Sequence, residues 1–174
     1  STEDKQVEDT KTRFMDCLAL IQEVMCEEIH LINHGGCGVF ASIIAHYMEQ
    51  HGLNPKIRIF SETFPEDFEE LDEAEEFMVT NGKNSVYEWN DIGVQFSHVV
   101  VQLDDCVFDG EDTRTIEDAL ENGYFHTTLL DGTVSTETMA ALAAENKWNL
   151  TYDRSQNGLV EKIIADCFAE CFVV

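Results

Sequence analysis

One stretch near the start of the chain limits the possible folds more than any other, because it joins a glycine-rich turn to a strongly apolar helical pattern. The turn, residues 33–38, contains three glycines and Cys37. Apolar side chains then recur at helical spacing, namely Val39, Phe40, Ile43, Ile44, Tyr47 and Met48. This spacing predicts a helix from Cys37 to about Gln50 that is apolar nearly all round and therefore buried.

Cys37 would be the first residue of that helix, which makes it a candidate nucleophile. The N-terminus of a helix carries a partial positive charge, and this charge favours a thiolate. The neighbouring glycines have no side-chain bulk, so other atoms can come close to the sulfur. A lone cysteine ahead of an apolar helix is more often buried and inert, and this alternative stays open.

Two apolar runs, residues 94–103 and 106–109, predict an antiparallel hairpin joined at Asp104-Asp105. A two-residue turn fixes the register and places Leu103 opposite Cys106. Side chains alternate along a strand, so one face of the hairpin is uniformly apolar and belongs in the core. That face consists of Val99, Val101, Leu103, Cys106 and Phe108.

The opposite face of the same hairpin carries His98 and Asp109, together with Val100, Gln102 and Val107. Asp109 lies opposite Val100, so it is the diagonal neighbour of His98, within reach of a side-chain hydrogen bond. We therefore expect these two side chains to form a pair. A purely structural histidine, and a simple turn at Asp109-Gly110, are the alternatives.

Together, Cys37, His98 and Asp109 supply the parts of a catalytic triad. A cysteine nucleophile needs a base, here His98, and the base needs an orienting acid, here Asp109. An oxyanion hole is also required, and the Cys37 backbone N–H is one expected donor. The second donor stays open among Asn33, His34 and Gln95.

A metal site is a weaker hypothesis for the same residues. The candidate ligands would be His34, Cys37, His46 and His98, but His46 lies more than two helical turns beyond Cys37. Cys167 and Cys171 share one helical face, but no further ligand is nearby. We expect no metal and no cofactor.

The net charge of the chain limits the kinds of partner that it can bind. Ten Lys and Arg against 35 Asp and Glu give a net charge of −25, which repels a phosphate backbone and argues against nucleic-acid binding. A basic protein partner, a salty cytoplasm and simple solubility all fit this charge. An acidic run over residues 65–77 predicts a surface helix that begins at Pro65.

The localisation that we expect is cytoplasmic. The six cysteines lack the spacing of a disulfide scaffold, which favours a reducing compartment. No apolar run approaches the length of a membrane span, and the N-terminal residues do not have the pattern of a signal peptide.

A chain of 174 residues is expected to form one domain, residues 1–174, of α+β class. Its parts would be an N-terminal helical segment (1–32), a core with the triad (33–110) and a C-terminal helical part (111–174). In the core, the central helix would pack on an antiparallel sheet that includes a strand over residues 56–60. The C-terminal part would hold a helix capped by Ser135 and ending at Glu145, a candidate strand at 149–152 and a helix over 160–172.

The segments 35–41, 97–101 and 107–110 resemble the papain-like cysteine peptidase superfamily, and most closely its transglutaminase-like and arylamine N-acetyltransferase-like branch. The resemblance covers roughly residues 33–110. It implies a cysteine at the start of a buried helix, packed on an antiparallel sheet that carries the histidine and the aspartate. By this resemblance Cys37 is the nucleophile, His98 the base and Asp109 the orienting acid, with a protein or peptide amide as substrate.

The expected function is therefore acyl transfer through a thioester, as amide hydrolysis, deamidation or transamidation. The alternative is a non-catalytic acidic binding module of the same fold, which engages a basic protein partner through the region around residues 66–76.

Overall fold

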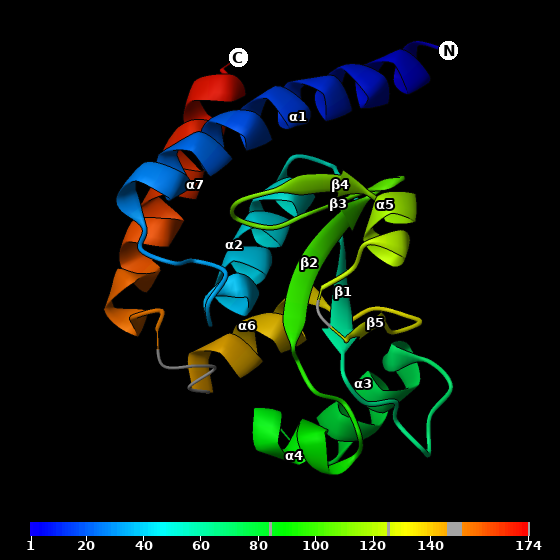
Figure 1. Ribbon diagram of the computed structural model, residues 1–174. Helices are drawn as coiled ribbons and strands as arrows, with labels where there is room; N and C mark the ends of the chain where they lie inside the picture. Colours follow the sequence, from blue (N-terminus) through cyan, green and yellow to red (C-terminus); the bar gives the residue numbers. More distant parts are fainter. Residues whose placement is uncertain (84, 125, 146–150, 174) are drawn as a thin grey trace.

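The computed structural model describes residues 1–83, 85–124, 126–145 and 151–173 (Figure 1). Within these ranges the chain is mixed α+β, with an antiparallel sheet of strand order β4-β3-β2-β1-β5 and several helices around it. The elements are α1 (Thr2–Glu28), α2 (Cys37–Gln50), β1 (Lys56–Ser61), α3 (Leu71–Thr80), α4 (Val86–Asp91), β2 (His98–Leu103), β3 (Cys106–Phe108), β4 (Thr113–Thr115), α5 (Ile116–Glu121), β5 (Thr128–Leu129), α6 (Thr136–Glu145) and α7 (Asn157–Cys171).

The predicted central helix is confirmed as α2, which begins at Cys37 and ends at Gln50. It packs against β1 and β2 of the sheet and also contacts α6 and α7 (Figure 1). Because apolar residues cover most of its surface, neighbours can surround it, and Phe40, Ile44 and Met48 are completely buried. Burial of each such side chain stabilises the fold by roughly 1.5–3 kcal/mol.

The β2–β3 hairpin has the predicted register. Leu103 pairs with Cys106 across the two-residue turn, and Val101 pairs with Phe108. Asp104 adopts a φ of 53°, which this tight turn requires. The predicted apolar face is buried in the main core, except that Cys106 is partly exposed beside the turn.

The strands of this hairpin are shorter than predicted. β2 begins at His98 and not at residue 94, because the Val94 N–H donates to the Trp89 carbonyl and the Gln95 N–H to the Ser61 hydroxyl. β3 ends at Phe108, because the Asp109 N–H turns to the carbonyl of Asp112. The segment before His98 is therefore a connection that follows α4.

The helix in the acidic run begins later than predicted. α3 starts at Leu71, whose N–H donates to the Asp131 carbonyl, while residues 65–70 form bends and irregular backbone. The short helices α4 and α5 were not predicted, because six residues are too few to show a clear helical period. The predicted cap of α6 is confirmed, since the Ser135 hydroxyl accepts from the Thr138 N–H.

Two terminal helices form one side of the molecule. α1 is a single helix, and its buried Phe14 ring lies 5.9 Å from that of Phe168 in α7. The candidate strand at 149–152 is not formed at Thr151 and Tyr152, which make a bend, and its first two residues lie outside the described ranges. Tyr152 instead donates its N–H to the His34 carbonyl.

The turn before α2 depends on glycine for two different reasons. Gly35 has a φ of 113°, a backbone conformation that other residues rarely adopt. Gly36 has no room for a side chain, because an added Cβ would lie 2.6 Å from the Ile32 carbonyl oxygen and 2.8 Å from the Tyr152 ring. Both glycines therefore fix the path of the chain into Cys37.

We expect Gly36→Ala to lower the free energy of unfolding by about 1–3 kcal/mol, because the new methyl group overlaps backbone and ring atoms. Gly158→Ala is the matched control, since its Cβ would meet nothing within 4 Å and alanine favours the helix by up to about 1 kcal/mol. Urea unfolding of both variants measures the difference. Equal stability of the two variants would contradict the close packing at Gly36.

Candidate functional site

Cys37 lies at the N-terminus of α2 and is 4% exposed. The helix has no side-chain cap, because its N-cap residue is Gly36. Its first hydrogen bond runs from the Phe40 N–H to the Gly36 carbonyl, so the N–H groups of Cys37 and Gly38 have no acceptor within the helix. The sulfur therefore lies where free N–H groups and the helix dipole favour negative charge.

The predicted contact between His98 and Asp109 is present. Nε2 of His98 lies 2.9 Å from Oδ2 of Asp109, and the two residues are only 6% and 2% exposed. The Cys37 side chain lies close enough to the imidazole to help raise the pKa of His98. Because Nε2 is used by Asp109, Nδ1 is the nitrogen left for the sulfur. The fold thus brings together all three residues that the sequence singled out.

The other carboxylate oxygen of Asp109 organises the turn that follows β3. Oδ1 accepts hydrogen bonds from the backbone N–H groups of Glu111 and Asp112, each at 2.8 Å. A turn at Asp109 and a pair with His98 are therefore not alternatives. One carboxylate makes both, and the turn fixes the direction in which Oδ2 points.

Two further side chains hold Asp109, and sequence reasoning assigned neither to this role. The Tyr124 hydroxyl donates to Oδ2 at 3.2 Å, and the nearby Asn33 side chain helps to lower the pKa of the carboxylate. Asn33 is a predicted candidate for the oxyanion donor, and in the structure it lies near Asp109 and favours the charged carboxylate. Tyr124 comes from a connection after α5 that has no periodic pattern, so no sequence signal marked it.

These contacts make the buried pair ionic. Burial alone would lower the pKa of His98, but hydrogen bonds with Asp109 and Cys37 outweigh it and raise the pKa to about 10. Burial would likewise raise the pKa of Asp109, but the hydrogen bond from His98 and its neighbours lower it below its usual value. At neutral pH the site therefore holds an imidazolium against a carboxylate.

His34 and Gln95, the other candidates for the second oxyanion donor, lie close in sequence to Cys37 and His98. Their backbone N–H groups, however, already donate to other acceptors. The His34 N–H donates to the Leu31 carbonyl, and the Gln95 N–H donates to the Ser61 hydroxyl. Their side chains stay candidates, and the free N–H groups at the start of α2 are the donors best placed by the fold.

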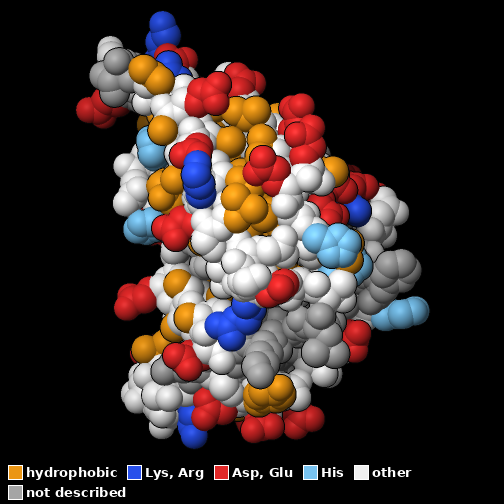
Figure 2. All heavy atoms as spheres, turned by 90° about the vertical axis from the view of Figure 1, so that its left-hand side faces the viewer, with side chains coloured by type: hydrophobic (Ala, Val, Ile, Leu, Met, Phe, Trp, Pro, Cys, Tyr) orange, Lys and Arg blue, Asp and Glu red, His pale blue; other side chains and the backbone are white. Residues whose placement is uncertain are grey.

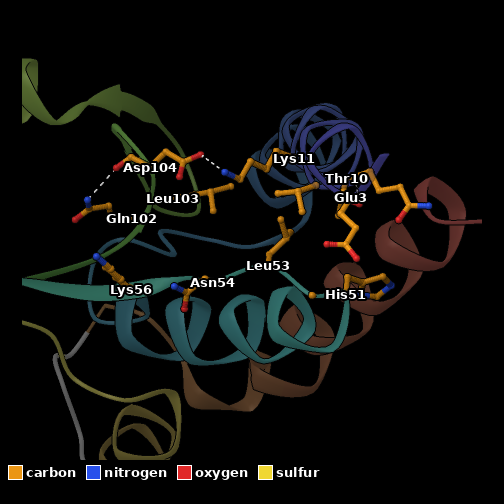
Figure 3. A pocket seen from close by; sticks show the side chains of 13 residues that line it. Glu3, Thr10, Lys11, His51, Leu53, Asn54, Lys56, Gln102, Leu103 and Asp104 are labelled. Atoms are coloured by element: carbon orange, nitrogen blue, oxygen red, sulfur yellow. Dashed lines mark hydrogen bonds and ion pairs between the residues drawn. The ribbon is translucent and has the colours of Figure 1, made fainter. Parts of the chain in front are cut away.

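A separate hollow of about 520 Å³ lies at the other end of α2, between α1 and the β2–β3 turn (Figure 3). Its lining includes His51, just beyond α2, and Lys11, which forms an ion pair with Asp104 at 2.9 Å. The length of α2 places this hollow about 20 Å from Cys37. A molecule bound there would not touch the thiol.

Within the described residues, no group of three or more His, Cys, Asp or Glu side chains is placed to hold a metal ion. His46, one of the candidate ligands, hydrogen-bonds Gln50 near the far end of α2. None of the helices in the described ranges combines the length and the apolar character that crossing a bilayer requires.

No protein-family model, curated protein or solved structure matches this chain.

The ionic pair predicts a pH dependence of stability. Because the folded pKa of His98 lies above its ordinary value of 6.5, its contribution is complete below about pH 6.5 and is lost as the pH rises through about 10. We expect the free energy of unfolding to fall by a few kcal/mol over this window. Urea titrations between about pH 6.5 and 8.5, below the ordinary pKa of cysteine, should show the fall in the wild type and its absence in His98→Gln. A flat wild-type profile would contradict an ionic pair.

Proposed function

We propose that this protein is a cysteine-nucleophile enzyme that transfers acyl groups through a thioester, with Cys37 as nucleophile, His98 as base and Asp109 as orienting acid. The observation that carries the proposal is the buried 2.9 Å contact between His98 and Asp109, with Cys37 against the same imidazole. Such an arrangement of nucleophile, base and orienting group is what covalent catalysis by a weakly acidic nucleophile requires.

The first half of the reaction forms the thioester. His98 holds the proton of the Cys37 thiol, and the thiolate attacks the carbonyl carbon of an amide. The negative charge that develops on the carbonyl oxygen is stabilised by the free N–H groups at the start of α2. His98 then gives its proton to the leaving amine, and the C–N bond breaks.

The second half releases the acyl group. Water or an amine attacks the thioester carbonyl, His98 accepts the proton of the attacking group, and the C–S bond breaks. Attack by water gives hydrolysis or deamidation, and attack by an amine gives transamidation. The triad is the same for these outcomes, so the amide of a protein or peptide is the substrate class that we propose.

The fold gives this proposal a second line of support. A cysteine at the start of a buried helix, packed on an antiparallel sheet with the histidine on one strand and the aspartate just after the next, is what the papain-like resemblance implies. We therefore extend the proposal to a papain-like core of the transglutaminase-like branch.

The proposal predicts one unusually reactive thiol. We expect Cys37 to react with iodoacetamide about tenfold faster or more at about pH 7 than the exposed Cys26, and His98→Ala to remove this difference. Mass spectrometry of the alkylated peptides measures each cysteine separately.

The remaining cysteines serve as internal controls in the same sample. Burial raises the pKa of Cys17, of Cys167 (to about 11) and of Cys106, so these thiols should react slowly in both proteins. If Cys37 reacts no faster than they do, the enzyme proposal is wrong.

A second candidate function is non-catalytic binding of a basic protein. The acidic run 65–77 and the residue just before it carry large apolar side chains at the surface, since Phe64 is 64% and Phe77 46% exposed. Carboxylates also dominate the charged groups on the face formed by α1 and α7 (Figure 2). Apolar and acidic groups side by side fit a basic, partly apolar peptide.

Binding of a peptide of alternating lysine and leucine, followed by Phe77→Ser, tests this second function. Weaker binding by the variant, together with an unreactive Cys37, would favour it. Undiminished binding by Phe77→Ser would exclude this surface. The exposed Leu120 on α5 gives a matched control, as Leu120→Ser, because it lies outside both the acidic run and the face formed by α1 and α7.

A further inference from the structure

Tyr124 touches both members of the buried pair in two different ways. Its hydroxyl donates to Oδ2 of Asp109 at 3.2 Å, and this oxygen also accepts from Nε2 of His98 at 2.9 Å. Its ring also lies against the imidazole, with the two centroids 4.1 Å apart. A side chain that merely filled space would need only the second contact.

The position of the tyrosine is itself fixed by its neighbours. The Phe60 ring meets it edge-on at 4.9 Å, and the Arg114 guanidinium lies over it at 5.2 Å from the centroid. The Tyr124 carbonyl accepts from the Thr127 N–H at 3.0 Å. These contacts hold the hydroxyl on Asp109 from one side, while the turn at Glu111 holds the carboxylate from the other.

We propose that Tyr124 is a positioning residue, which controls how firmly His98 holds its proton by sharing Oδ2 of Asp109 with it. This inference rests on the proposed function only for the catalytic use of the proton. The contacts of Tyr124 with His98 and Asp109 do not depend on catalysis. The charged and titratable groups that face the pair or the tyrosine are Cys37 from α2, Asp112 from the turn, Arg114 from β4 and the pair itself.

The direction of the effect follows from the competition for one oxygen. The tyrosine hydroxyl withdraws part of the negative charge of Oδ2, so the carboxylate attracts the imidazolium less strongly than it would alone. Without the hydroxyl, the full charge faces His98. The imidazolium should then keep its proton to higher pH, and the base would release it less readily during the second half of the reaction.

Tyr124→Phe removes the hydroxyl and keeps the ring, which makes it the decisive variant. The readout is the titration of the His98 imidazole by ¹H–¹⁵N NMR, with its signals assigned by their loss in His98→Gln. We expect the midpoint to rise by about one pH unit, because a hydrogen bond to a charged group is worth roughly that much. An unchanged or lowered midpoint overturns the inference.

Tyr152→Phe is the matched control. This tyrosine also loses a hydroxyl hydrogen bond, to Oδ1 of Asn157 at 2.6 Å, but it does not contact the pair. A shift of the same size in both variants would show a general effect of packing and would also overturn the inference.

The same titration in a Cys37→Ala background separates this inference from the proposed function. A shift caused by Tyr124→Phe in that background supports the role of Tyr124 even if Cys37 proves unreactive in the wild type. If Cys37 is reactive but Tyr124→Phe does not shift the His98 titration, the enzyme proposal stands and the proposed role of Tyr124 is wrong.

Discussion

The buried ion pair between His98 and Asp109 is the interaction on which the candidate site depends. Two charges removed from water are costly unless hydrogen bonds satisfy them. Here the carboxylate accepts from the imidazole, from two backbone N–H groups and from the Tyr124 hydroxyl, and the nearby Asn33 side chain also favours its charged form. Residues from four separate parts of the chain thus converge on one aspartate. Loss of any one of these hydrogen-bond donors leaves the negative charge of Asp109 less well compensated.

The position of Cys37 depends on a different constraint, which is the burial of α2. Because this helix is apolar on most sides, it can be surrounded by the sheet, α6 and α7 at once. Its polar N-terminus must then end at the boundary of the core, and the tight path through Gly36 brings it there. Cys37 and the pair are thus placed by two independent features, which meet at the start of β2. Their meeting is the strongest structural argument for chemistry at this site.

Local patterns predicted the parts of the site that lie close together in the sequence. The helical period from Val39 to Met48 set the bounds of α2, and the alternation on either side of Asp104 set the register of β2 and β3. That register brings Asp109 close to His98, and the turn that follows β3 directs its carboxylate toward the imidazole. The papain-like identity of the core and the acyl-transfer reaction stay predictions.

The sequence by itself therefore determined α2, the hairpin and the pair on it, since each is encoded by a period within a few neighbouring residues. Only the tertiary structure decided where β2 and α3 begin, because these ends depend on distant partners, Ser61 for Gln95 and Asp131 for Leu71. It also decided that Cys37 meets His98 and that Tyr124 and Asn33 support Asp109. Hydrogen bonds between distant segments leave no periodic trace in a sequence, and they form only once the core has brought those segments together.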